Sequence, residues 1–255
     1  MTDSGVQSNN VTESQSCGDK VINLGKSSAM PAVRASRPRR AGWDRRSQSG
    51  LETVTAAVLA VAAAGPGSDV IDVGCGNGRL SIPLAERGAR VLAVDVSPGL
   101  AGRLARVAAE RELAGIRVLA TPIESLSRPA GSADLVVSCY AMHRLRDADK
   151  ARLIAAAFEW LRPGGELVLA DMMFGRGRTS QDRAIIRFKI RALARKGVGG
   201  WWRIAKNGYR YLVRSADYPL SISAWTAMLA RAGFTGITAS SVLNEAGLVT
   251  ARRPA

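Results

Sequence analysis

Histidine and cysteine are scarce in this 255-residue sequence, which has one histidine and three scattered cysteines, Cys17, Cys75 and Cys139. A disulfide scaffold needs paired cysteines, and a zinc site needs closely spaced cysteine or histidine ligands, so we expect neither. Scattered cysteines of this kind are typical of reduced thiols and predict a cytoplasmic protein. The sequence also lacks the long apolar run of a transmembrane helix, because the Ala-rich apolar stretch 51–64 is too short to span a bilayer.

Apolar side chains are nevertheless abundant, at 47% of the residues, which excludes wholesale disorder and is enough for a sizeable core. The polar residues 1–30 and the arginine-rich residues 31–47 are predicted to form a mobile basic arm without the apolar core of a signal peptide. We therefore expect one α/β domain over residues 48–255, preceded by the arm 1–47.

Positive charge is concentrated in one part of the chain. The formal net charge is +15, yet residues 51–100 carry a net charge of −2. Residues 174–214, by contrast, contain twelve basic residues and a single acidic residue, Asp182. A regional excess of this size argues against general supercharging and indicates a local anionic partner.

Strand-like and helix-like segments alternate along most of the domain, a pattern that predicts βαβ units and a parallel sheet. The end of the chain differs, because two strand-like runs around Asn244 follow a helical segment and predict a strand pair. The expected strands are 70–73, 91–94, 116–120, 135–138, 166–170, 234–240 and 247–251. The expected helices are 51–64, 80–86, 98–113, 147–161 and 223–231.

A glycine-rich loop follows the first expected strand, with glycines at positions 74, 76 and 78. Glycines let the backbone turn tightly and approach a ligand closely. Asp95 ends the next strand, twenty-one residues after Gly74, where a carboxylate can accept both hydroxyls of a ribose. Asp72, just before the glycines, would repel a dinucleotide pyrophosphate but suits a cationic amino group.

Four blocks of the sequence, in order, resemble those of the class I S-adenosylmethionine-dependent methyltransferases. The glycine loop 72–78 resembles the first motif of that family, and residues 94–98 resemble its ribose-binding block. Residues 134–143 resemble the block at the fourth strand, and residues 161–167 resemble the turn before the fifth. The resemblance implies an α/β fold with a Rossmann-like, doubly wound sheet of seven mostly parallel strands, closed by a C-terminal antiparallel hairpin.

The resemblance also implies which residues bind S-adenosyl-L-methionine. The glycines would enclose the methionine part, Asp72 would lie near its amino group, and Asp95 would hold the ribose. Pro122 stands where the family often has an aspartate for the adenine amino group, so Glu124 or the backbone at Ile123 would serve instead. The implied cofactor-binding residues are Asp72, Gly74, Cys75, Gly76, Asn77, Gly78, Asp95, Val96, Ile123, Glu124 and Ser138.

The residues after the fourth strand form the expected acceptor wall. Because the sulfonium is already activated, methyl transfer needs alignment and exclusion of water more than acid–base help. His143 is nevertheless a candidate catalytic residue, since it could deprotonate an acceptor hydroxyl. The alternative is that His143 caps or packs the following loop. Tyr140 is expected either in the pocket wall or in the core.

A basic, aromatic insert, residues 174–222, separates the fifth strand from the last helix. Its arginines recur at every fourth position, which places them along one side of a helix: Arg183, Arg187, Arg191 and Arg195. Three interpretations are a lid over the acceptor, a nucleic-acid surface and a membrane-surface patch. A solvated basic helix in a small subdomain is the fourth.

These features together predict a methyltransferase that acts on an O, N or C atom of a small-molecule acceptor. The acceptor is expected to be either anionic or aromatic or lipidic in character. The expected acceptor contacts are Tyr140, His143, Trp201, Trp202 and Tyr209. One alternative is an RNA methyltransferase whose insert holds phosphates. Another is a non-catalytic cofactor-binding protein with an interaction role. Peripheral contact with a membrane is also compatible with the insert.

Overall fold

The computed structural model describes residues 45–174, 217–243 and 245–255, together with positions 183, 187, 190, 191, 194, 195 and 197. The expected arm 1–47 lies outside the described residues except at 45–47, where the first helix begins. Most of the insert 174–222 also lies outside them. The arrangement of the sheet and its helices is therefore that of the described residues alone.

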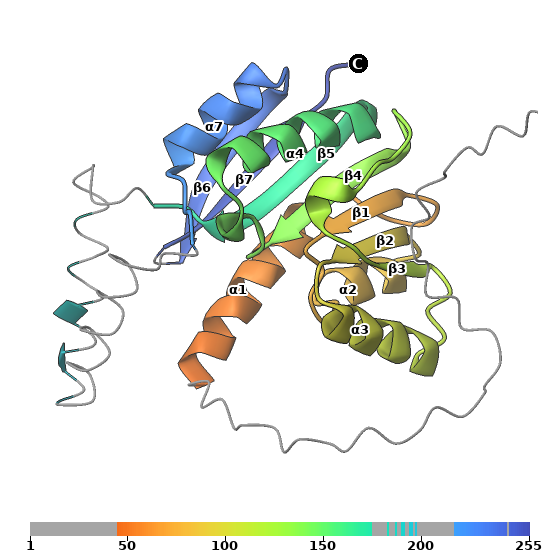
Figure 1. Ribbon diagram of the computed structural model, residues 1–255, viewed down its shortest axis with the longest axis horizontal. Coiled ribbons are helices and arrows are strands. Elements are labelled where there is room, and N and C mark those ends of the chain that lie inside the picture. Colours follow the sequence, from red (N-terminus) through yellow and green to blue (C-terminus); the bar gives the residue numbers. More distant parts are fainter. Residues whose placement is uncertain are drawn as a thin grey trace, which may run out of the picture.

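Seven strands form one sheet at the centre of the fold (Figure 1). They are β1 (Asp69–Val73), β2 (Arg90–Asp95), β3 (Ile116–Ala120), β4 (Ala133–Cys139), β5 (Leu161–Met172), β6 (Thr235–Leu243) and β7 (Ala246–Arg252). Their order is β3-β2-β1-β4-β5-β7-β6, with β1 to β5 parallel and β7 antiparallel to both β5 and β6. The predicted doubly wound, mostly parallel sheet with a C-terminal antiparallel hairpin is thereby confirmed.

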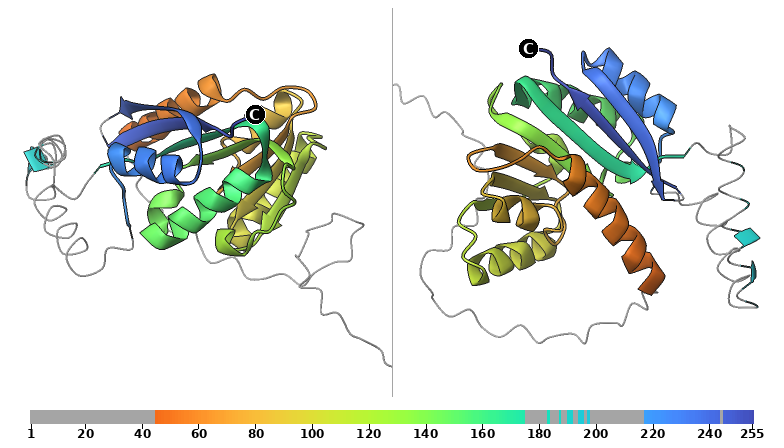
Figure 2. Two further views of the ribbon diagram at one scale, coloured as in Figure 1. Left: turned by 90° about the horizontal axis from the view of Figure 1, so that it is seen from above. Right: turned by 180° about the vertical axis from the view of Figure 1, so that it is seen from behind.

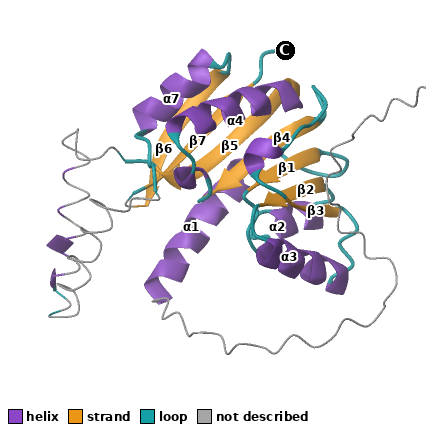
Figure 3. Ribbon diagram, in the orientation of Figure 1, coloured by secondary structure: helices purple, strands orange, loops and turns teal. Residues whose placement is uncertain are grey.

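Helices cover both faces of the sheet (Figures 2 and 3). The α-helices are α1 (Arg45–Val61), α2 (Ser81–Glu86), α3 (Pro98–Glu110), α4 (Asp147–Trp160) and α7 (Ile222–Arg231). Two short 3₁₀ turns, η1 (Ile123–Ser125) and η2 (Met142–Arg144), follow β3 and β4. The buried side chains of α1, α2 and α3 pack on one face, and those of α4 and α7 pack on the other.

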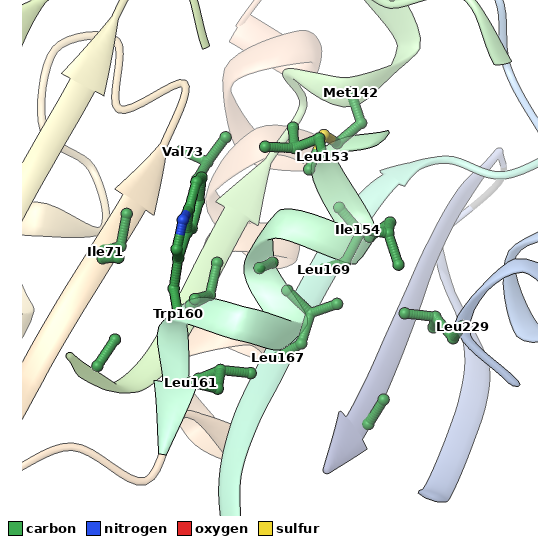
Figure 4. Close-up of a cluster of buried hydrophobic side chains, with 14 of the residues drawn as sticks. Ile71, Val73, Met142, Leu153, Ile154, Trp160, Leu161, Leu167, Leu169 and Leu229 are labelled. Carbon is green, nitrogen blue, oxygen red and sulfur yellow. The ribbon is translucent and has the colours of Figure 1, made fainter. Parts of the chain in front are cut away.

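The strand residues alternate between these two hydrophobic layers. Val70 packs with the α1–α3 layer, whereas Ile71 and Val73 pack with the α4–α7 layer. Trp160, at the end of α4, is buried and lies beside Val73 (Figure 4). Burial on both faces explains why the central strands are nearly continuous apolar runs. Asp72 is the exception among the buried residues of β1, because its side chain carries a carboxyl.

The ends of α1 and α3 each differ from the prediction by three residues. Helix α1 ends at Val61, three residues before the expected end, and the chain then enters the turn around Gly65. Helix α3 ends at Glu110 instead of 113, because Glu112 has a left-handed φ of 55° that a helix cannot continue through. The start of α3 is as expected, with Pro98 in the first turn after the capping residue Ser97.

Candidate active site

The carboxyl ends of β1, β2 and β4 border a cavity of about 960 Å³. Parallel strands of an open α/β sheet present their carboxyl ends at one edge, which is where such sheets bind ligands. The cavity brings together nine of the residues predicted to bind the cofactor: Asp72, Gly74, Cys75, Gly76, Asn77, Asp95, Val96, Ile123 and Glu124. Tyr140, predicted to contact the acceptor, also lines it.

Other residues of the lining had no signal in the local sequence pattern. Helix α1 contributes Leu51 and Thr55 from far upstream, and η2 contributes Arg144 with the adjacent Leu145. Arg79 follows the glycine loop and adds a guanidinium to the lining. The remaining residues of this kind are Leu80 and Leu100, whereas Ser97, Cys139 and Ala141, which also line the cavity, lie in the predicted blocks 94–98 and 134–143.

The glycine loop has a left-handed backbone conformation that residues other than glycine rarely adopt. Gly74 and Gly76 have φ angles of 77° and 55°. A Cβ added at Gly74 would lie 2.2 Å from the Cβ of Ala141, so this glycine permits the loop after β1 to touch the loop after β4. A Cβ added at Gly76 would meet nothing within 4 Å, and this residue lines the cavity. Gly74 therefore serves packing, whereas Gly76 leaves space at the cavity.

Asp95 is held by the backbone on both sides. Its Oδ2 accepts a hydrogen bond from Gly76 N at 2.9 Å, and its Oδ1 accepts one from Ser97 N at 2.8 Å. A carboxylate offers about four acceptor positions, so each oxygen can still accept one more donor. The carboxylate is thus fixed in the cavity lining and can still accept hydrogen bonds from two adjacent donors.

Asp72 lies almost completely buried beneath the glycine loop. Burial raises the pKa of its carboxyl to about 7, although the hydrogen bond from Ser81 Oγ to Asp72 Oδ2, 2.5 Å long, opposes that shift. The nearby Asp95 carboxylate adds a smaller upward contribution to the same pKa. A buried carboxyl with this pKa becomes a strong partner for a cation once it loses its proton.

Two predicted cofactor residues, Ser138 and Gly78, do not line the cavity. The Ser138 hydroxyl is fully buried and donates to the Val73 carbonyl at 2.8 Å, which ties β4 to β1. Gly78 packs against Leu104 of α3, because a Cβ there would lie 2.3 Å from Leu104 Cδ1. The structure gives both residues a packing role beside the cavity.

The far wall of the cavity comes from the end of β4. Tyr140 has a left-handed φ of 55°, an uncommon conformation for a bulky residue, and it is half-buried. Burial raises the pKa of Tyr140 well above its usual range, so its hydroxyl stays protonated. Burial also raises the pKa of Cys139 to about 12, which keeps that thiol neutral and a poor nucleophile.

His143 does not line the cavity, although its neighbours Tyr140 and Arg144 do. Its side chain is buried against β5, with Nδ1 2.6 Å from Asp171 Oδ1. Nothing in the sequence marked Asp171 as a partner of His143, apart from its position directly after a predicted strand. The predicted acceptor contacts Trp201, Trp202 and Tyr209 lie outside the described residues.

The described part of the insert retains the row of arginines. All four are exposed, and the first three lie in helical backbone: Arg183, Arg187, Arg191 and Arg195. Within the described ranges, no group of three acidic, cysteine or histidine side chains is placed to hold a metal ion. None of the described helices combines the length and apolar character needed to cross a membrane.

Comparison with known proteins finds a family model that matches the middle part of this chain. Residues 70–165 match the family model of a methyltransferase domain. An uncharacterized methyltransferase of Geobacillus kaustophilus is 32% identical over 117 residues, which cover 46% of this chain and 53% of that protein. A ubiquinone biosynthesis O-methyltransferase of Acinetobacter baylyi is 37% identical over 108 residues, covering 42% and 44% of the two chains.

The fold is also similar to that of a solved methyltransferase structure. The crystal structure of an S-adenosylmethionine-dependent methyltransferase from Mesorhizobium loti superposes with a TM-score of 0.59, covering 80% of this chain and 100% of the other, at 21% identity. This similarity concerns the fold alone. The chain spans about half the length of the curated relatives that it matches.

Substituting alanine for Gly74 and for Gly76 should lower the stability of the fold to different extents. Gly74→Ala and Gly76→Ala share the left-handed strain, which costs about 1–2 kcal/mol. Gly74→Ala adds a clash with Ala141, which costs about 1–3 kcal/mol more. Chemical denaturation should therefore find Gly74→Ala clearly the less stable of the two. Equal destabilisation would contradict the close approach of the two loops.

Proposed function

We propose that this chain, whose residues 70–165 match the family model of a methyltransferase domain, is a class I S-adenosylmethionine-dependent methyltransferase that transfers a methyl group to a small-molecule acceptor. One observation carries the proposal. Two buried carboxyls, Asp72 and Asp95, lie on adjacent strands at their carboxyl ends and line the same cavity beside a glycine loop. They provide separate anchors for a cationic amino group and for a pair of ribose hydroxyls.

The lining fits S-adenosyl-L-methionine in each of its parts. Asp72 suits the amino group, the acceptor positions left on Asp95 suit the ribose, and Gly76 leaves space between them. Ile123 and Glu124 of η1 lie at the cavity where an adenine would need a wall and an acceptor. When bound, this cofactor supplies a methyl group on a positively charged sulfur, which is ready for attack by a nucleophile.

The chain itself then has two roles, which are to align the acceptor and to exclude water. Apolar side chains from several elements line the cavity and help to exclude water: Leu51, Leu100, Ile123 and Leu145. The neutral Cys139 thiol and Tyr140 hydroxyl argue against a covalent intermediate on either residue. Direct transfer from cofactor to acceptor is therefore the mechanism that the cavity supports best.

The acceptor that we favour is a small molecule with an anionic group. The arginine row, Arg183 to Arg195, supports an anionic partner. The same row favours RNA as a second candidate acceptor, because arginines at this spacing can also contact phosphates. An O-methyltransferase among the relatives is consistent with the first candidate, although this chain covers only part of that protein.

Asp72 predicts how cofactor affinity depends on pH. The carboxyl must lose its proton to attract the amino group, and its pKa is about 7. Affinity for S-adenosylhomocysteine should therefore weaken as the pH falls from about 7 to about 5.5, by up to about tenfold per pH unit. The amino group stays protonated over this range, since α-amino groups titrate near pH ~8. Calorimetric titration at several pH values measures the slope.

The control variants separate Asp72 from the general charge of the cavity. Asp72→Asn should bind more weakly above the pKa of the native carboxyl and lose the pH slope, because the amide does not titrate. Glu124→Gln removes an exposed carboxylate from the same lining and should keep the slope. An unchanged slope in Asp72→Asn would exclude this carboxyl as the amino-group partner.

A labelled-methyl transfer screen tests the proposed activity. The chain is incubated with methyl-labelled S-adenosylmethionine and a cell extract separated into small molecules, lipid, RNA and protein. We expect label in the small-molecule fraction, with a rate that depends little on salt. Label in RNA, with a steep salt dependence, would favour the RNA alternative. Label in no fraction, despite cofactor binding, would indicate a non-catalytic cofactor-binding protein.

A further inference from the structure

A buried histidine–aspartate pair lies beside the cavity, on the side away from the cofactor anchors. His143 is in η2, directly after β4, and Asp171 is near the end of β5. The Asp171 side chain is completely buried, and Oδ1 lies 2.6 Å from His143 Nδ1. Asp171 Oδ2 also accepts a hydrogen bond from the His143 backbone N–H at 2.7 Å. One carboxylate thus holds both the ring and the backbone of the histidine.

The surrounding donors determine how the ring is oriented. The backbone N–H groups of His143 and Met172 can only donate, and they occupy both oxygens of Asp171. Because both oxygens of Asp171 act as acceptors, the facing Nδ1 of His143 must be a donor. The proton of the neutral imidazole therefore lies on Nδ1. The lone pair is then left on Nε2, which is the arrangement of a base held ready by a carboxylate.

The position of the pair relates it to acceptor binding. Tyr140, Ala141, Arg144 and Leu145, on either side of His143, all line the cavity. The Tyr140 ring meets the His143 ring edge-on, with the ring centroids 6.4 Å apart. His143 therefore stands one side chain away from the cavity that would hold the methyl donor.

Residues near the end of the insert also lie against His143. Tyr218 N donates to the His143 carbonyl at 2.6 Å, and the buried Lys150 Nζ donates to the Tyr218 carbonyl. Asp217 Oδ1 lies 4.0 Å from His143 Nε2, beyond hydrogen-bond range, and 3.8 Å from Arg144 Nε. The histidine is thus fixed between the cavity and the point where residues 175–216 rejoin the fold.

We propose that His143 is the general base for the acceptor and that Asp171 is its positioning residue, so that the acceptor is a hydroxyl compound. This inference rests on the proposed function. The acceptor hydroxyl gives its proton to Nε2, and its oxygen forms the new bond to the methyl carbon. The carbon–sulfur bond breaks with its electron pair left on sulfur. Asp171 stabilises the imidazolium that results.

The charged and titratable groups around the imidazole come from several elements. They are Asp171 of β5, Arg144 of η2, Tyr140 before η2, Asp217 near the end of the insert and Lys150 of α4. Asp171 and Asp217 face the two ring nitrogens, and the exposed Arg144 guanidinium lies beside Asp217.

The single histidine of the chain allows a direct test that needs no acceptor. Nitrogen NMR of the full chain with ¹⁵N-labelled histidine reports which ring nitrogen carries the proton. We expect the Nδ1–H form in the native chain and loss of that preference in Asp171→Asn. Asp69→Asn is the matched control, because it removes a carboxylate that pairs with Arg90 at the other end of the sheet. A native Nε2–H form, or no change in Asp171→Asn, would overturn the positioning role.

The second arm measures transfer of labelled methyl to the small-molecule fraction. His143→Gln should lower the initial rate by about 100-fold or more, the usual contribution of a general base, while binding of S-adenosylhomocysteine stays within about twofold. Asp171→Asn should lower kcat more than it raises KM. In the native chain, the rate should rise with pH over the range in which the NMR signals of His143 titrate.

The outcomes distinguish this inference from the proposed function. An O-methylated product together with these losses supports the base. An unchanged rate in His143→Gln, or a product methylated on carbon or sulfur, would overturn it while leaving the methyltransferase proposal intact. Failure of the native chain to bind S-adenosylhomocysteine would instead contradict the proposed function, and the NMR result would still report on the pair.

Discussion

The carboxylate of Asp95 connects the two loops that define the cavity. One oxygen accepts from the backbone of Gly76 and the other from the backbone of Ser97, so the glycine loop and the start of α3 share one anchor. These bonds depend on β1 and β2 being adjacent and parallel, because only then do their ends meet at one edge. The neighbouring Gly74 brings in the loop after β4, since no side chain fits between it and Ala141. The geometry of the candidate site follows from these contacts.

The cavity divides into two sides with different chemistry. On the side of β1 and β2, Asp72 and Asp95 provide negative charge and hydrogen-bond acceptors. On the side of β4, Tyr140 lines the cavity and stays protonated, and the neighbouring His143, outside the lining, is held by a buried carboxylate. A cationic cofactor suits the first side, and an acceptor that must lose a proton suits the second. The excess positive charge of the chain is instead concentrated in the insert.

The sequence predicts the positions of the residues at the carboxyl ends of β1 and β2 well, because their signals are local. The glycines, Asp72 and Asp95 follow directly from strands with clear apolar runs, and parallel strands present their ends together. Ser138, also predicted to bind the cofactor, does not line the cavity, and its hydroxyl bonds to the Val73 carbonyl inside the sheet. The helix ends were predicted less well, since the left-handed Glu112 leaves no residue pattern that marks it.

The acceptor side was largely beyond prediction because its contacts are long-range. Asp171 lies 28 residues after His143, and only the pairing of β4 with β5 brings them together. Leu51 and Thr55 reach the cavity from α1, upstream of the sheet.

The central claim is that Asp95 anchors S-adenosylmethionine here, and calorimetric titration of the full chain with S-adenosylhomocysteine tests it most directly. We predict saturable binding of one ligand per chain, weakened at least about tenfold by Asp95→Ala, a loss of one charged hydrogen-bond partner. No saturable binding, or undiminished binding by the variant, would contradict it.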